Sequence, residues 1–347
     1  MSDLPADRAA LAQRFRAFAE HEGRGASPLY ERLCVALADD AAILALAAEA
    51  TTLPVPNLLL GAVQYLLFAH PGDPLAAFYP SLTATPATGD PYPAFRAFCL
   101  AQQTAITRIL QTRRVQTNEV RRCACLLPAF GLVAAQAAGR PLALIEIGAS
   151  AGFNLLWDHY GYEYGVAGQA GDPQAALQLH CEVRGGHQLP IPQPFPTVAG
   201  RLGIDLHPID VRDPQAMAWL RALIWPEHAD RRTLLDAAAA TVLADSPALR
   251  AGDALALLPS VLAHLPADVV PCVFHSFTLN QFAPQDRDRL TTILAACGTR
   301  RDCYRISIEM LQVGAPELRL EQWHAGRHHE ALLARCNPHG AWIEWLA

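Results

Sequence analysis

The sequence lacks lysine, because all 27 basic residues among its 347 are arginines. This absence excludes enzymes that form a Schiff base on a lysine and nucleotide-binding loops that need a lysine for phosphate. Long apolar runs are also missing. The longest, residues 58–69, is interrupted by Gln64 and is shorter than the roughly 20 residues that a membrane-spanning helix needs. We therefore expect no membrane segment.

Paired cysteines and an excess of basic charge are missing as well. The nine cysteines are odd in number, and no two have Cys-x-x-Cys spacing, which is typical of a reduced cytoplasmic protein rather than a disulfide scaffold. Residues 1–5 lack the basic and then apolar pattern of a secretion signal. The net charge of -6 argues against nucleic-acid binding. We expect a cytoplasmic protein that acts on a small molecule.

What is present indicates two kinds of structure. Hydrophobic residues make up 52% of the chain, enough for a sizeable core. Residues 1–140 show helical periodicity and predict an α-helical N-terminal domain. Residues 141–347 alternate strands with helices, which predicts a doubly wound, mostly parallel α/β sheet. Within this second domain, Gly185-Gly186 predicts a hairpin insertion near residues 177–196.

The most informative segment is residues 142–156, where an apolar strand ends in an acid, a turn of small residues follows, and a helix begins. Such a loop directs backbone N–H groups toward a ligand beyond the strand's carboxyl end. Its pattern Glu-x-Gly-x-Ser-x-Gly resembles the first motif of S-adenosylmethionine-dependent methyltransferases. That resemblance implies a Rossmann-like methyltransferase-type sheet and S-adenosylmethionine as the cofactor. The cofactor-binding residues that it implies here are Glu146, Gly148, Ala149, Ser150, Gly152 and Asn154.

The same loop has other interpretations. As Gly-x-Ser-x-Gly it resembles the nucleophile elbow of α/β-hydrolases, with Ser150 as the nucleophile. That fold needs strands before the elbow, whereas helices precede it here, and no His-Gly-Gly-Gly segment occurs upstream. Four late histidines could still supply the base: His324, His328, His329 and His339. The dinucleotide fingerprint fails at Ser150 and Phe153. A loop packed without ligand, or a non-catalytic binding protein, also remains open.

Two further acids and one histidine follow strands of the predicted sheet. Asp205 resembles the acid that grips the ribose hydroxyls at the end of the second methyltransferase strand, since a carboxylate accepts two hydrogen bonds from a vicinal diol. It lies more than 50 residues beyond the first motif, so Glu163 is the nearer alternative. Asp253 resembles the third motif, which meets the adenine. His275 ends the fourth strand, as a general base for the acceptor or as a structural histidine.

A polar segment lies between two apolar helices at residues 113–122. Thr117 or Asn118 can cap the following helix, and Glu119 complements its dipole. Gln116 and the four arginines of this segment exceed what capping needs. We therefore place the acceptor near Thr117, Asn118, Glu119 and Arg122, together with His275. The spacing of His324 and His328 suits two metal ligands on a helix, but no third ligand is evident, and we expect a solvated helix face and no metal.

Three segments together resemble an uncharacterised bacterial family over nearly the full chain: residues 116–119, 146–155 and 203–208. The family carries no established activity. The hypothesis from sequence is a methyltransferase acting on a small molecule, with a non-catalytic relative of the same fold or a serine hydrolase as alternatives.

Overall fold

The structure is a computed structural model that describes residues 7–116, 119–312 and 314–347. Its contacts divide the chain into two compact units. One, the sheet unit, comprises residues 119–212 and 234–347, and the other, the helical unit, comprises residues 7–116 and 213–233. The domain boundary predicted near residue 140 refers to parts that fold independently, and it stays a prediction. Among the described residues, no helix has both the length and the apolar character needed to cross a bilayer.

The helical unit is a set of short helices around one apolar core. Polar side chains begin several of them: Asp7, Ser27 and Asp40 each accept a hydrogen bond from a backbone N–H of the first turn. Leu11, Phe15 and their equivalents on the other helices fill the core. The helices are α1 (Arg8–Phe18), α2 (Pro28–Leu37), α3 (Ala41–Ala47), α4 (Val55–Leu67), α5 (Tyr92–Ala101), α6 (Gln103–Thr112) and α8 (Pro214–Leu223), with shorter turns at Ala19–Gly23 and Pro74–Phe78.

Helix α8 joins this unit although it lies a hundred residues further along the chain. Gln64 of α4 is fully buried, and its amide nitrogen donates to the carbonyl oxygens of Ala222 at 2.9 Å and Ile224 at 2.6 Å. The hydroxyl of Ser81 donates to the Gln64 carbonyl oxygen at 3.0 Å. These bonds satisfy the carbonyls at the end of α8, which would otherwise be buried without a donor.

Replacing Gln64 by leucine should therefore destabilise the helical unit. Leucine keeps the apolar stem but leaves two carbonyls and one hydroxyl unpaired, which costs about 2–4 kcal/mol. Urea unfolding of the variant measures this loss. The control is Gln103→Leu at an exposed position of α6, where we expect a change below about 0.5 kcal/mol. Equal losses at the two positions would contradict the role given to Gln64.

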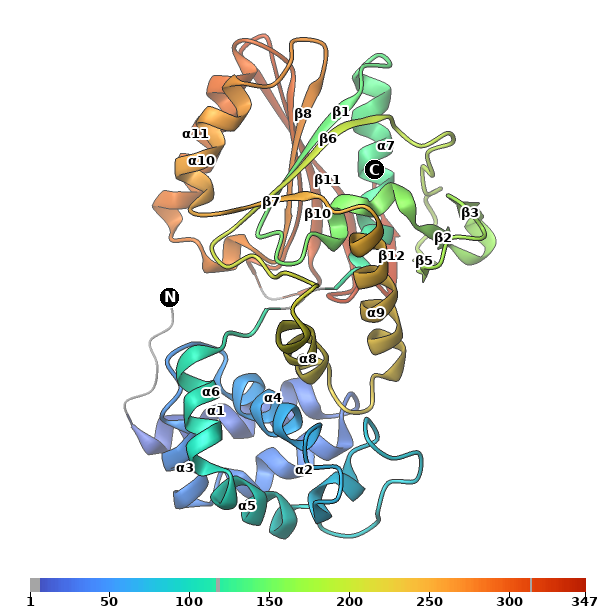
Figure 1. The fold of residues 1–347 in the computed structure, drawn as a ribbon. Coiled ribbons are helices and arrows are strands. Elements are labelled where there is room, and N and C mark those ends of the chain that lie inside the picture. The colour runs from blue at the N-terminus through green and yellow to red at the C-terminus, as the bar shows by residue number, and fades with distance from the viewer. Residues whose placement is uncertain (1–6, 117–118, 313) are drawn as a thin grey trace. The chain divides into compact units, whose positions relative to one another are not determined.

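The sheet unit is built on nine strands in the order β5-β12-β11-β10-β9-β8-β1-β6-β7 (Figure 1). From β9 to β7 all neighbours are parallel, whereas β10, β11 and β12 pair antiparallel and β5 pairs parallel to β12. The predicted mixed α/β class with a mostly parallel sheet is confirmed. The strands are β1 (Leu142–Ile147), β5 (Glu182–Arg184), β6 (Val198–Asp205), β7 (Ala248–Ala251), β8 (Val270–Ser276), β9 (Cys303–Glu309), β10 (Glu317–His324), β11 (Arg327–Cys336) and β12 (Trp342–Trp345).

Helices cover both faces of the parallel part. Val273 of β8 packs with α10 (Ala254–Ala263) and α11 (Pro284–Gly298). The next residue, Phe274, faces the other way and meets Phe130 of α7 (Arg122–Gln136), with ring centroids 5.3 Å apart. Burial on both faces explains why β1 and β8 are apolar on both faces rather than alternating, until the polar residues near their carboxyl ends. Helix α9 (Ala229–Ala244) belongs to both units, because its residues up to 233 fall in the helical unit and those from 234 in the sheet unit.

A second, three-stranded sheet lies within the sheet unit and corrects one prediction. It has the order β3-β2-β4, with β2 (Gly161–Glu163), β3 (Gln169–Ala170) and β4 (Gln178–His180). The predicted hairpin near 177–196 is wrong, because β4 pairs with β2 while β5 joins β12 of the large sheet. Only Cys181 separates β4 from β5, too little chain for a hairpin turn, and Gly185-Gly186 follows β5 rather than connecting two paired strands.

A second correction concerns the late histidines. His324 and His328 do not lie on a helix, because β10 and β11 form an antiparallel hairpin with His324 opposite Arg327. Ala325 and Gly326 both have positive φ, 48° and 75°. Two such residues are typical of the tight turn that connects twisted strands. Across residues 7–116, 119–312 and 314–347, no group of three or more histidine, cysteine or acidic side chains is arranged to hold a metal ion.

Candidate functional site

The loop after β1 folds tightly against the neighbouring strand β6. Gly148 has φ 75° and donates its N–H to the carbonyl of Ile204 at 2.8 Å. Gly203 of β6 lies opposite Glu146, and a Cβ at Gly203 would lie 2.6 Å from the Cβ of Ala149. The missing side chain at Gly203 therefore lets the loop lie on β6. Ser150 has φ 50° and Gly152 φ 79°, and the N–H of Gly152 donates to Ala149 at 2.7 Å.

Three carboxylates stand at the carboxyl ends of three adjacent parallel strands. Glu146 belongs to β1, Asp205 is the last residue of β6, and Asp253 lies two residues after β7. Because these strands are neighbours and run in the same direction, the three acids lie along one edge of the sheet. The three acids that follow apolar segments in the sequence therefore lie at or just after the ends of strands.

Two of these acids already hold backbone amides. Asp205 accepts the N–H of Ser150 and the N–H of His207, each at 2.8 Å, one on each carboxylate oxygen. Asp253 accepts the N–H of Leu255 at 2.9 Å and so caps α10. A carboxylate can accept about four hydrogen bonds, so both acids keep acceptor capacity. Asp205 fixes the loop, and the amide of Ser150 points at a protein oxygen.

Glu146 is different, because one of its oxygens has no partner. The side chain is 1% exposed. Its Oε1 accepts the amide N–H of Asn154 at 2.8 Å, while Oε2 is buried without a hydrogen bond in the described chain. Burial raises the pKa of Glu146 to about 8, the Asn154 hydrogen bond opposes this shift, and the charge of Asp205 adds to it. An unsatisfied buried carboxylate is costly, and a cation beside it would remove that cost.

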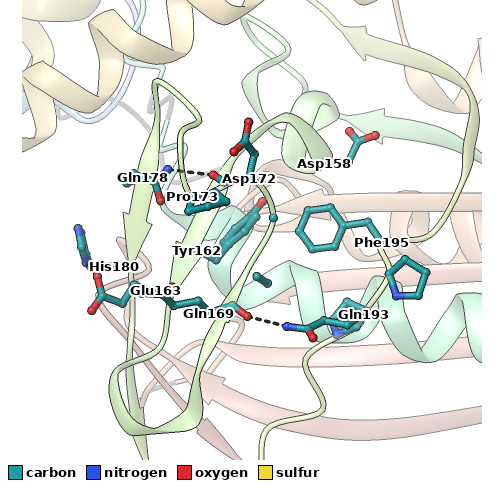
Figure 2. A pocket seen from close by; sticks show the side chains of 14 residues that line it. Asp158, Tyr162, Glu163, Gln169, Asp172, Pro173, Gln178, His180, Gln193 and Phe195 are labelled. Carbon is teal, nitrogen blue, oxygen red and sulfur yellow. Dashed lines mark hydrogen bonds and ion pairs between the residues drawn. The ribbon is translucent and has the colours of Figure 1, made fainter.

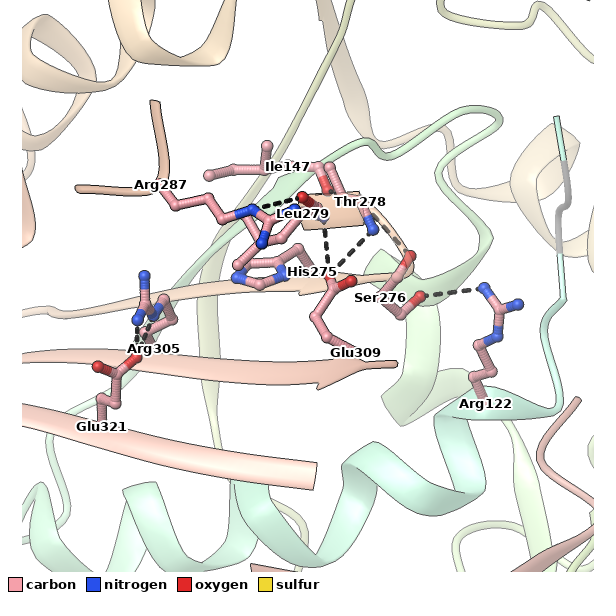
Figure 3. A network of polar contacts seen from close by, with 10 residues as sticks. All are labelled: Arg122, Ile147, His275, Ser276, Thr278, Leu279, Arg287, Arg305, Glu309 and Glu321. Carbon is pink, nitrogen blue, oxygen red and sulfur yellow. Dashed lines mark hydrogen bonds and ion pairs between the residues drawn. The ribbon is translucent and has the colours of Figure 1, made fainter. Parts of the chain in front are cut away.

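A buried polar network holds the carboxyl end of β8 against the carboxyl end of β1 (Figure 3). Glu309, at the end of β9, accepts from His275 Nδ1 at 2.7 Å, from Thr278 N at 2.9 Å and from Leu279 N at 3.1 Å, all on Oε1. The hydroxyl of Thr278 donates to the carbonyl of Ile147 at 3.2 Å. The network therefore fixes the turn after β8 beside the turn after β1.

Arg122 reaches the same strand end from the start of α7. Its Nε donates to the carbonyl of Pro338 at 2.8 Å and its NH1 to the hydroxyl of Ser276 at 3.3 Å. The guanidinium carbon lies 4.2 Å from the ring centroid of Phe277, a cation–π contact. Phe277 itself has φ 55°, a conformation that is uncommon for a side chain of this size. Backbone strain of this kind clusters at functional sites.

A family model described as an uncharacterised protein conserved in bacteria, DUF2332, matches residues 12–345. The chain belongs to this family. No curated protein and no solved structure matches the chain. The predicted resemblance to an uncharacterised bacterial family is confirmed, and the resemblance to methyltransferases stays a prediction.

The remaining predicted site residues are distributed as follows. Glu119 is 4% exposed, and its Oε2 lies 3.3 Å from His339 Nδ1. Thr117 and Asn118 lie outside the described residues. Glu163 belongs to β2 of the small sheet, where its Oε2 lies 3.0 Å from His180 Nδ1. Of the two alternatives for the ribose acid, Asp205 is the one bonded to the glycine loop.

The hydrolase alternative loses three of its four candidate bases. His324, His328 and His329 lie on the β10–β11 hairpin, where Trp323 pairs with Cys303 at the start of β9. Ser150 follows the end of β1, which runs parallel to β8 and β9. The three histidines therefore lie beside the amino-terminal ends of the parallel strands, whereas Ser150 lies beyond their carboxyl ends.

Thr278, Ser276 and Glu309 also belong to this site and were not predicted from the sequence. A signal for Glu309 was available, because it is an acid at the carboxyl end of a strand, as Glu146 is. Thr278 and Ser276 carried no pattern of their own. Only the pairing of β8 with β1 and β9 gives them a place in the site.

Proposed function

We propose that the sheet unit binds S-adenosylmethionine at the carboxyl edge of β1, β6 and β7 and transfers its methyl group to a small molecule. The observation that carries this proposal is the buried Oε2 of Glu146, which lacks a partner in the described chain at the end of β1. An ammonium group of the ligand would supply the missing donor.

The order of the strands supports a ligand at this place. Counted along the chain, β7-β6-β1-β8-β9 are the third, second, first, fourth and fifth strands of the parallel part. This is the order of doubly wound folds that bind nucleosides. In such sheets the connections leave in opposite directions from the first and fourth strands, and ligands bind outside the carboxyl ends at that point. Here the point lies between β1 and β8, beside Gly148 and Thr278.

The charge of the edge favours a cation over a phosphate. Asp205 and Asp253 bring two carboxylates to neighbouring strand ends, and Glu146 beside them adds a third when a cation displaces its proton. A phosphate group would be repelled there. S-Adenosylmethionine carries a sulfonium and an ammonium group and no phosphate. Its ribose hydroxyls can donate to a carboxylate, which suits Asp205.

Methyl transfer does not require a nucleophile on the enzyme. Two reactants held in line and close together gain most of the rate from positioning. Ser276, at the end of β8, and Arg122, which donates to it from α7, lie beside the proposed cofactor position and are the residues that would contact the acceptor. His275 is fully buried and bonded to Glu309, and it would hold this strand end in place.

Titration calorimetry tests the proposal directly. We expect binding of S-adenosylmethionine and S-adenosylhomocysteine and no binding of NAD⁺, whose diphosphate would meet the three acids. A search for transfer of a deuterated methyl group to the small molecules of a bacterial extract then identifies the acceptor. Binding of NAD⁺ but of neither methionine derivative would overturn the proposal, as would labelling of Ser150 by a fluorophosphonate.

A further inference from the structure

The hydrogen bond that Asn154 donates to Glu146 is one link of a longer chain that begins on helix α7. The thiol of Cys123 donates to the amide oxygen of Asn154 at 3.2 Å, and the amide nitrogen of Asn154 donates to Glu146 Oε1 at 2.8 Å. Cys123 is fully buried, and Asn154 comes from the turn Phe153–His159. Helix α7, this turn and β1 therefore meet at Glu146, whose Oε2 ends the chain of bonds.

Packing places Cys123 on the face of α7 that lies against the sheet. Phe130 of the same helix meets Phe274 of β8 with ring centroids 5.3 Å apart, and Phe274 pairs with Glu146 across the strands. Cys123 precedes Phe130 by two helical turns, so the two side chains share one face of the helix. The thiol therefore reaches the sheet near the carboxyl end of β1, where Glu146 lies.

The thiol of Cys123 carries its hydrogen and is a donor. Burial raises its pKa well above the usual range, and the negative charges of Glu146 and Asp158 add to this shift. Asp158 lines the pocket beside the small sheet that Figure 2 shows, and Arg201 pairs with it at 2.8 Å. A neutral thiol presents its hydrogen to an oxygen, so the amide of Asn154 directs its oxygen toward α7 and its N–H toward β1.

The reverse orientation of this amide would change the state of Glu146. With its oxygen toward β1, Asn154 would repel an ionised carboxylate and would accept a hydrogen bond from a protonated one, so the acidic proton would sit on Oε1. In the observed orientation Oε1 accepts, and any proton that Glu146 carries sits on Oε2. Oε2 is the atom that would meet the ammonium group of the ligand.

We propose that Cys123 is a positioning residue, whose S–H fixes the amide of Asn154 so that Glu146 keeps Oε2 for the ammonium group of the ligand. The part of this proposal that concerns the ligand rests on the function proposed above, whereas the chain of hydrogen bonds belongs to the protein alone. The other charged groups that act on Glu146 are Asp205 of β6 and Arg122 of α7. A substitution at Cys123 leaves both in place and therefore tests the chain of bonds by itself.

The variants Cys123→Ala and Cys123→Ser separate this role from a packing role. Alanine removes the donor, and we expect the affinity for S-adenosylmethionine at pH 7 to fall about three- to tenfold. Serine keeps an O–H donor and should restore most of this affinity. Cys272→Ala is the matched control, because burial alone raises the pKa of that fully buried thiol on β8, and its removal should leave the affinity unchanged. An equal loss in the two alanine variants would reject the role of Cys123.

Infrared difference spectroscopy of the free protein tests the chain of bonds without a ligand. The band of the protonated Glu146 carboxyl, identified by its absence from Glu146→Gln, should disappear near pH 8 in the wild type and in Cys123→Ser. In Cys123→Ala the amide can reverse and stabilise the protonated carboxyl, so we expect the band to persist to a higher pH. Should Cys123→Ala not fold, Cys123→Val removes the same donor while filling the space.

The two measurements distinguish the two proposals. A titration of Glu146 that is the same in Cys123→Ala as in the wild type would overturn the role of Cys123, even if S-adenosylmethionine binds. A wild type that does not bind S-adenosylmethionine, while the titration shifts as expected, would overturn only the proposed function.

Discussion

The substitution Glu146→Gln is expected to lower the affinity for S-adenosylmethionine about 10- to 100-fold, which corresponds to the loss of one charge-assisted hydrogen bond. Glutamine can still accept from Asn154, so the loop keeps its internal bond, but its second polar atom is a donor and cannot take an ammonium group. Calorimetry of wild type and variant measures the difference. Glu317→Gln, at a half-exposed ion pair with Arg319, is the control and should leave the affinity unchanged.

The raised pKa of Glu146 adds a pH dependence to this result. With a pKa of about 8, the carboxyl is mainly protonated at pH 7, and a cationic ligand must displace that proton. We expect the affinity to rise about tenfold per pH unit up to pH 8 and then level off, with protons released on binding. The Glu146→Gln variant should lack this slope. An affinity of the wild type that does not vary between pH 6 and 8 would contradict the role of Glu146.

The same shift changes the stability of the unliganded protein. Because the pKa of Glu146 is higher in the folded state than in the unfolded state, its contribution is complete below about pH 4.5 and is lost as the pH rises to about 8. Relative to Glu146→Gln, the wild type should therefore lose about 3–5 kcal/mol of unfolding free energy across this range. Urea unfolding at several pH values measures both proteins.

The largest loss of stability is expected from Glu309→Ala. Glu309 is 7% exposed, and one of its oxygens accepts from His275 and from the N–H groups of Thr278 and Leu279. Alanine leaves three buried donors without an acceptor, at a cost of about 3–5 kcal/mol. Glu309→Gln keeps an acceptor oxygen and should cost about half as much.

Thermal and urea unfolding of the Glu309 variants, beside Glu317→Ala, test this expectation. The ion pair of Glu317 with Arg319 is partly exposed, and its loss should cost less than about 1 kcal/mol. The role of Glu309 would be rejected if alanine there were no more harmful than at Glu317.

The sequence predicted those parts of the fold whose signals are local. The run of apolar residues that ends in Glu146, the small residues at 148–152 and the acid at Asp205 indicated strand ends and a tight turn, and the structure has a strand end at each place. His275 was likewise expected near the end of a strand, and it is the residue before the last of β8. In each case the preference of a few neighbouring residues agreed with the final packing.

What the sequence did not predict depends on distant pairing. Helix α8 belongs to the helical unit because Gln64 bonds to the end of that helix, a relation that no local pattern contains. The strand at Glu182–Arg184 looked like half of a hairpin because its true partner, β12, is far along the chain. Glu309 belongs to the site only because β9 pairs with β8 in the sheet.

The pairing of β5 with β12 also has a consequence for synthesis on the ribosome. Glu182 pairs with Trp342, and at about 5–20 residues per second the later strand emerges on the order of ten seconds after the earlier one. During that interval β5 lacks its partner in the large sheet, because β12, the strand with which it pairs, has not yet been made. An uncovered edge invites pairing with other chains. We therefore expect the nascent protein to need protection by a chaperone until β12 has been made.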